Sequence, residues 1–235
     1  MAHISPRAPN GFTLIEIVIM LAIGGLLVSG LIKGQELIAS ARVHTLITQQ
    51  ENVSAAYLGF RDRFRALPGD YGQASIYIAG VAAGANGNNN GLITAAGIAG
   101  ATTDEHIAAW EHLTKAGFLQ GSYTYAAAPA TTDSVPISVY GRLLQLTYDN
   151  AYGAGTSAMR HNFKTGNFIP SVILAAVDRK IDDGIATSGM FQFSEYDGGG
   201  AGSSPTGSGT CYASSGTAVW LTTTPAENCG GASLF

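Results

Sequence analysis

A single charge, the carboxylate of Glu16, interrupts an apolar run that extends from Gly11 to Leu31. A run of about 20 apolar residues is long enough to cross a bilayer as a helix. Ionised groups in such segments are costly, and those that occur usually have a function. We therefore interpret the run as a membrane helix in which Glu16 has a chemical role, the alternative being an accidental polar residue in an anchor.

The boundary between Gly11 and Phe12 is the second feature with chemical potential. An ordinary secretory signal places a small-residue cleavage site after its apolar core, whereas here the small residue precedes the core and follows a short, weakly cationic leader, residues 1–10. The sequence Gly-Phe-Thr-Leu-Ile-Glu at 11–16 resembles the processing motif of type IV pilins and type II secretion pseudopilins. The resemblance implies that a membrane peptidase cleaves after Gly11 and methylates the new amino group of Phe12.

The same resemblance gives Glu16 a partner. An unpaired carboxylate in hydrocarbon is relieved by an ammonium group through a charge-assisted hydrogen bond. By similarity to pilins, Glu16 pairs with the amino group of Phe12 in an adjacent subunit and helps to set the register of a filament. The chain then divides into a removed leader (1–11), a membrane and filament-core half-helix (12–33), and an amphipathic half-helix with a globular head (34–235).

Composition limits the remaining classes. The chain has 235 residues, of which 46% are hydrophobic, enough for the anchor and one globular domain with a core. The net charge is -4, and it becomes -5 when the leader and its one arginine are removed, so a uniformly basic, nucleic-acid-binding surface is not expected. The basic cluster Arg61, Arg63 and Arg65 contains Asp62, and we interpret it as a solvated helix end rather than a lipid or nucleic-acid contact.

The elements that position these residues begin with one long helix, predicted from about Phe12 to Arg65. Apolar residues recur at mostly helical spacing in its second half, which should lie against a sheet. Glycines weaken its first half, and we expect bending or unwinding there after assembly, or else close helix packing; these are Gly24, Gly25, Gly30 and Gly34. The resemblance implies a pilin fold of class α+β, in which this helix packs on an antiparallel β-sheet and a disulfide closes a loop-rich C-terminal region.

Shorter elements are predicted after Pro68 and Gly69 end the long helix. A capping box of Thr102 and Glu105 should start a helix that Gly117 ends and in which Trp110 is a core residue. A second helix is predicted over 170–183. Strands are predicted over 122–127, 136–148 and 189–196.

One loop resembles a metal-binding sequence. Residues 86–93 match the first part of a calcium loop, with ligand candidates at Asn86, Asn88 and Asn90. All three are neutral amides, and the closing position is Gly97, so calcium would need Asp104 or Glu105 to fold back. We therefore favour an ordinary turn-rich loop and predict no cofactor, with calcium as the alternative.

Other polar groups give no catalytic site. His106 and His112 are six residues apart and lie on different helix faces, which argues against a shared metal. Asp182 and Asp183 at a helix C-terminus oppose the helix dipole; they could bind a cation or cap a loop, and we favour solvated surface. The residues 153–158 fit a dinucleotide fingerprint without the required βαβ unit. No catalytic residue is predicted.

Cys211 and Cys229 are the only cysteines, and both lie beyond the predicted anchor, outside the cytoplasm, where disulfides persist. A bridge between them would enclose the segment around Trp220 and stabilise the fold by about 3 kcal/mol in the chain-entropy model. The bridge would also match the disulfide-bounded C-terminal region of many type IV pilins. Metal binding by two lone thiols is a poor rival.

The leading hypothesis is a structural subunit, not an enzyme, that prepilin peptidase processes and that inner-membrane machinery assembles into a homo-oligomeric helical filament. The precursor would lie in the bacterial inner membrane and the product at the cell surface, with a role such as adhesion. The predicted disulfide and the large, loop-rich head favour a surface pilus. The alternatives are a periplasmic pseudopilin of a type II secretion system and a minor pilin with an adhesive head.

Overall fold

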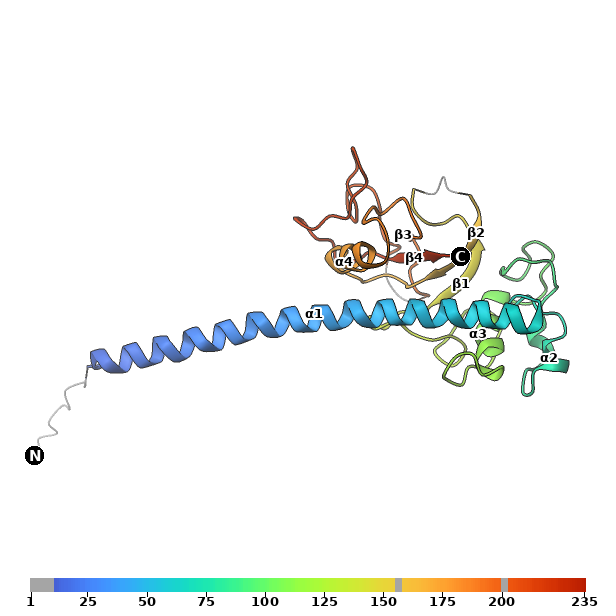
Figure 1. Cartoon of the computed structure of the whole chain (residues 1–235), viewed down its shortest axis with the longest axis horizontal. Coiled ribbons are helices and arrows are strands. Elements are labelled where there is room, and N and C mark those ends of the chain that lie inside the picture. The colour runs from blue at the N-terminus through green and yellow to red at the C-terminus, as the bar shows by residue number, and fades with distance from the viewer. Residues whose placement is uncertain (1–10, 155–157, 200–202) are drawn as a thin grey trace, which may run out of the picture. The chain divides into compact units, whose positions relative to one another are not determined.

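The computed structural model of the chain describes residues 11–154, 158–199 and 203–235. Its contacts form two compact units, Met1–Ala41 and Arg42–Phe235, and each unit is described by itself. Helix α1 (Leu14–Phe64) begins in the first unit and ends in the second (Figure 1). The predicted long helix, about Phe12 to Arg65, is therefore confirmed.

The second unit contains the remaining elements. In chain order they are α2 (Ala74–Tyr77), the 3-10 helix η1 (Ala83–Ala85), α3 (Glu105–Lys115), β1 (Gln145–Asp149), β2 (Arg160–Lys164), α4 (Ser171–Ile181), β3 (Phe191–Phe193) and β4 (Gly231–Leu234). The strands form one four-stranded sheet in the order β1-β2-β4-β3. All three pairings are antiparallel.

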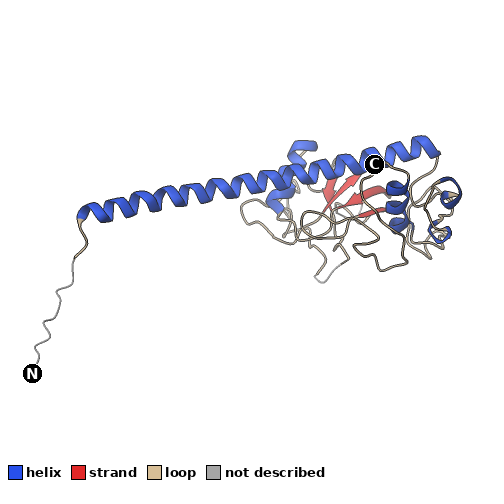
Figure 2. Ribbon diagram, turned by 90° about the horizontal axis from the view of Figure 1, so that it is seen from below, coloured by secondary structure: helices blue, strands red, loops and turns tan. Residues whose placement is uncertain are grey.

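The part of α1 that belongs to the second unit packs on this sheet, shown red in Figure 2. The buried side chains Tyr57 and Phe60 of α1 share a core with Trp110 of α3 and Phe163 of β2. Tyr57 also stacks on Phe235, with ring centroids 4.8 Å apart. The predicted α+β class, with a long helix on an antiparallel sheet, is confirmed, and so is the prediction that Trp110 is a core residue.

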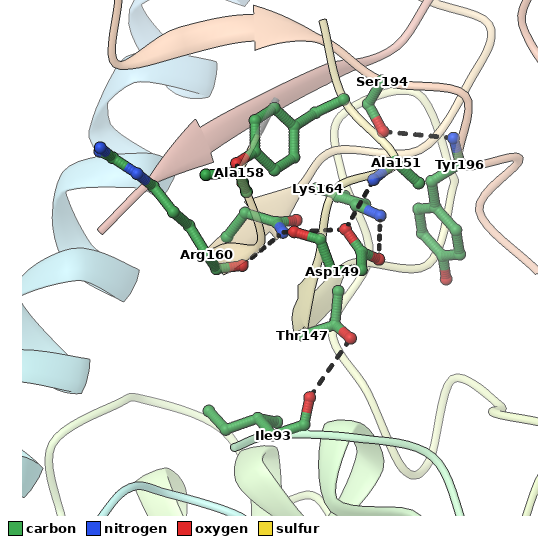
Figure 3. Close-up of polar contacts among 11 residues, drawn as sticks. Ile93, Thr147, Asp149, Ala151, Ala158, Arg160, Lys164, Ser194 and Tyr196 are labelled. Atoms are coloured by element: carbon green, nitrogen blue, oxygen red, sulfur yellow. Dashed lines mark hydrogen bonds and ion pairs between the residues drawn. The ribbon is translucent and has the colours of Figure 1, made fainter. Parts of the chain in front are cut away.

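An ion pair joins Asp149 of β1 to Lys164 of β2 (Figure 3). Lys164 Nζ lies 2.5 Å from Asp149 Oδ2, and the Lys164 side chain is only 3% exposed. Burial lowers the pKa of Lys164, and the adjacent Asp149 carboxylate opposes that change. Thr147 Oγ1, on β1, donates to the carbonyl of Ile93 and so connects the sheet to the loop that precedes α3.

The strand predictions were partly wrong. Residues 122–127 form no strand, because Tyr125 N donates to the Glu111 carboxylate of α3 and Thr124 N to the Asp133 carbonyl. Of the predicted strand 136–148, only the end lies in β1, since a turn with Gly141 at φ +71° breaks the run. The strand predicted within 189–196 is present as β3, and two strands, β2 and β4, were not predicted.

Both shorter helices are present, as α3 and α4. The predicted capping box at Thr102 is wrong, because Asp104 occupies the N-cap position and makes no capping hydrogen bond. Glu105, which was expected to complete the capping box, binds the preceding loop instead, where it accepts from Thr94 N and Asn88 N. Asp104 accepts from Ala96 N of the same loop.

Candidate processing and assembly site

The predicted cleavage site lies in exposed, non-helical chain. Residues 11–13 precede the first helical residue, Leu14. Phe12 is 70% exposed, and a Cβ built on Gly11 would meet no atom within 4 Å. The predicted cleavage position between Gly11 and Phe12 is therefore exposed among the described residues.

Thr13 and Glu16 form a reciprocal cap at the start of α1. Thr13 Oγ1 accepts a hydrogen bond from Glu16 N at 3.3 Å, and Glu16 Oε2 accepts one from Thr13 N at 3.5 Å. This is the capping-box arrangement, and it places a negative charge where the helix dipole favours it. The carboxylate of Glu16 consequently lies at the same helix end as the nitrogen of Phe12. The Thr-x-x-Glu spacing at 13–16 was the sequence signal for this cap, and our sequence reasoning missed it.

The described part of the first unit, residues 11–41, contains no buried residue. Among the described residues, α1 is the one helix long and apolar enough to span a membrane. Its large apolar side chains are exposed, for example Leu21 at 71% and Leu26 at 75%. An exposed apolar surface of this extent marks a contact with lipid or protein. The apolar helix and the position of the cleavage motif fit a membrane-anchored precursor.

The four glycines in this half of α1 leave the helix continuous. A Cβ built on any of them would meet no atom within 4 Å, so no close approach in this structure requires them; they are Gly24, Gly25, Gly30 and Gly34. Their expected role, bending or close packing after assembly, stays a prediction about the filament.

The three asparagines proposed as calcium ligands take part in the hydrogen bonds of a turn-rich loop. The side-chain oxygen of Asn86 accepts from Ser75 N, that of Asn88 from Asn90 N, and that of Asn90 from Leu92 N. The nearby carboxylate of Asp70 accepts from Asn90 N and Gly91 N. This arrangement supports the turn-rich loop that the sequence favoured.

The acidic residues at the end of α4 cap the loop that follows. The carboxylate oxygens of Asp178, Asp182 and Asp183 lie within 4.8 Å of one another. Asp178 accepts from Trp220 Nε1 at 2.6 Å, and Asp182 accepts from Phe191 N at 2.9 Å. Burial raises the pKa of Asp178, and the Trp220 hydrogen bond opposes this rise. Asp182 is half-buried and caps the loop, which was the alternative interpretation, whereas Asp183 is exposed, as the favoured interpretation expected. The other alternative, a bound cation, stays a prediction.

The buried side chain of His112 joins two segments of the chain by hydrogen bonds, a role that the sequence did not predict. Its Nδ1 accepts from Gly69 N at 2.9 Å, and its Nε2 lies 2.9 Å from the Ala85 carbonyl, to which it donates. Burial lowers the pKa of His112 to about 4. Burial also lowers the pKa of His106. The two histidines do not belong to any three-residue group of metal-binding side chains in the described part of the chain.

Two other sequence features are the basic cluster at 61–65 and the fingerprint-like stretch at 153–158. The basic cluster lies at the end of α1, where Arg65 is 3.7 Å from Asp62 and both side chains are more than four-fifths exposed. This is the solvated helix end that was expected. Of the fingerprint-like stretch 153–158, residues 155–157 lie outside the described residues.

The disulfide between Cys211 and Cys229 is present, with Cα atoms 5.8 Å apart. It closes a loop that binds the start and middle of α4. Ser171 N donates to the Ala226 carbonyl, and Trp220 Nε1 donates to Asp178. The predicted loop-rich, disulfide-closed C-terminal region is therefore part of the fold.

A family model described as the prokaryotic N-terminal methylation motif matches residues 6–32. This motif is the signature of type IV prepilins and pseudopilins, which are structural rather than enzymatic proteins. It supports a type IV pilin-like or pseudopilin-like protein. Comparisons with curated proteins and with solved structures gave no match.

Proposed function

We propose that the chain is the structural subunit of an extracellular type IV pilus-like filament. Prepilin peptidase cleaves the precursor between Gly11 and Phe12 and methylates the Phe12 nitrogen, and inner-membrane machinery then assembles the product. The methylation motif at 6–32 is the observation that carries this proposal.

The geometry of the N-terminal region is consistent with each step. The scissile bond is exposed and precedes a capped helix end, so cleavage need not unwind α1. The residues from Phe12 to Lys33 form the membrane anchor first and the filament core later. Burying such apolar surface yields about 25 cal/mol per Å², which makes packing against other copies favourable once the helix leaves the lipid.

Glu16 has an intermolecular role in this proposal. Its carboxylate, which caps its own helix in the subunit, pairs with the methylated ammonium of Phe12 in a neighbouring subunit. A charge-assisted hydrogen bond offsets part of the cost of burying both charges in an apolar core.

The deciding experiment is mass spectrometry of material sheared from the outside of cells of the source bacterium. We expect an abundant peptide that begins at N-methylated Phe12. The same peptide found only in the cell envelope would contradict a surface filament and indicate a type II secretion pseudopilin or a tethered minor subunit. A peptide that still contains the leader would contradict the processing step itself.

A further inference from the structure

A groove in the head has the chemistry of an interface with another copy of the chain. It encloses about 610 Å³ between α1 and the ends of α4, β3 and β4. Three large apolar side chains in it are exposed: Leu58 at 45%, Ile181 at 40% and Met190 at 50%. Surface of this kind on a subunit of a polymer is a candidate for burial.

Polar groups in the groove have no partners within the described residues. Gln50 is 7% exposed, yet its Nε2 donates to no acceptor, and Ser233 Oγ is likewise buried and unpaired. A buried donor without an acceptor costs about 1–3 kcal/mol. Glu51 of α1 and Lys180 of α4, also in the groove, form no ion pair among the described residues. An occupant should therefore be apolar and carry both charges.

One exposed helix face of the same chain meets these requirements. Lys33, Glu36, Leu37 and Ser40 recur at spacings of three and four residues in α1, so they share a face. Leu37 is 72% exposed, and the Lys33 and Glu36 side chains, which pair with each other at 2.8 Å, are 74% and 62% exposed. Ser40 is also exposed on that face.

We propose that the groove receives the Lys33–Ser40 face of α1 from a second copy of the chain. Lys33 of that copy lies against Glu51, Glu36 against Lys180, and Leu37 among the exposed apolar side chains of the groove. This assignment rests on the proposed function, because it requires a polymer of this chain. It adds a specific contact between the N-terminal half of α1 in one subunit and the head of another.

Cysteine cross-linking tests the contact in intact filaments. The native cysteines are both in the disulfide, so Leu37→Cys with Met190→Cys introduces the reactive pair. Filaments of this double variant, mildly oxidised after shearing, should give a ladder of multimers on a non-reducing gel that a thiol collapses to monomer. Leu27→Cys with Met190→Cys is the matched control, because Leu27 lies about 15 Å along the same helix. If the protein from these oxidised filaments runs only as a monomer on the non-reducing gel, the assignment is wrong.

Charge reversal gives a second test that does not depend on the cysteine variant assembling. Glu51→Lys and Lys33→Glu alone should each reduce the amount of sheared filament about tenfold or more, since each places like charges together. The double reversal restores the pair and should recover most of the wild-type yield. Wild-type yield from both single variants, or no recovery in the double variant, would contradict the contact.

Failure of this inference differs from failure of the proposed function. If wild-type cells release filaments of this chain and neither test succeeds, the groove assignment alone is wrong. If wild-type cells release none, the surface-filament proposal is wrong and the groove assignment falls with it.

Discussion

The two parts of α1 differ in what surrounds their apolar side chains. In the first unit Leu27 is 64% exposed and Leu37 is 72% exposed. In the second unit Val53 is 1% exposed and Phe60 is fully buried, in a core shared with α3 and the sheet. One continuous helix therefore carries two surfaces with opposite requirements.

This difference implies that the side chains that stabilise the fold and most of those that are available for assembly lie in different parts of the chain. Residues from Arg42 onward have their own core, sheet and disulfide, whereas no residue of the helix from Leu14 to Ala41 is buried. Substitutions of buried residues in the second unit should change the free energy of unfolding. Substitutions in the first unit should change processing and assembly while the head stays folded.

The largest effect is expected at the cleavage site. Gly11→Val should leave the precursor uncut, because a branched side chain would stand beside the scissile bond, and the exposed position predicts no loss of head stability. The mass of the cellular protein measures this directly, since uncut protein retains the leader. Gly30→Val is the matched control, as its added side chain also meets no atom, and it should be cleaved normally. Mature protein from Gly11→Val at the normal yield would remove the processing claim.

A pair of truncations tests the contrast between the two parts of α1. Phe60→Ala should lower the free energy of unfolding by about 3–5 kcal/mol, because it leaves a cavity in the core. Leu27→Ala should change it by no more than about 0.5 kcal/mol. Urea denaturation of the full chain in detergent micelles, followed by tryptophan fluorescence, compares them. Comparable destabilisation by the two variants would mean that the units do not fold separately.

Removal of the disulfide should have the next largest effect on the head. Replacing both Cys211 and Cys229 by Ser frees a loop whose ends are 18 residues apart, which costs about 3 kcal/mol in the chain-entropy model. The same denaturation measurement checks this value. The loop contact between Trp220 and Asp178 should loosen as well, so the tryptophan emission of the folded variant should shift to the red. Unchanged stability would show that the loop contacts alone hold this region.

A smaller effect is expected from acidification. His112 is buried and neutral, with a pKa of about 4, while the unfolded chain has the ordinary value of about 6.5. Between these values the unfolded state binds more protons, so stability falls as pH falls. From pH 6.5 to pH 5 the loss from His112 is about 1.6 kcal/mol. Burial raises the pKa of Asp70 and Glu105, which act in the opposite direction as they protonate.

Denaturation curves of wild type and His112→Gln across this pH range measure the histidine contribution. The variant should be less stable at pH 7, because the donor Gly69 N loses its acceptor, and its stability should depend less steeply on pH. Equal slopes for the two proteins would assign the acid sensitivity to other groups, among them His161, whose pKa burial also lowers to about 4.

Sequence periodicity and local chemistry were sufficient for the parts of the fold that carry strong local signals. The long helix has an apolar first half and ends before Pro68, and α4 has a proline just before its first residue. The cleavage motif and the cysteine pair were equally readable, because each depends on a few residues at fixed positions.

The missed elements depend on contacts that are distant in sequence. β4 has the sequence Gly-Ala-Ser-Leu, with little strand propensity, and lies between β2 and β3 because its small residues fit against large neighbours. A Cβ on Gly231 would be 2.4 Å from the Phe191 ring. The role of His112 likewise requires Gly69 and Ala85, which only the folded chain brings to it. Tertiary packing overrides local propensity at such positions.

The smallest expected effect sharpens the role of Glu16. Thr13→Ala removes one half of the cap on α1 and should cost about 1 kcal/mol of helix stability. Cleavage should continue, and the amount of sheared filament should stay within about twofold of wild type, because this variant keeps the Glu16 carboxylate and loses only one cap hydrogen bond. Glu16→Ala removes the cap and the proposed partner of the Phe12 ammonium, so it should be cleaved yet assemble far less. Mass spectrometry and filament yield, measured for both variants, separate the two roles of the carboxylate. If Thr13→Ala reduces assembly as much as Glu16→Ala, then Glu16 contributes through the helix cap, and the pairing between subunits is not needed.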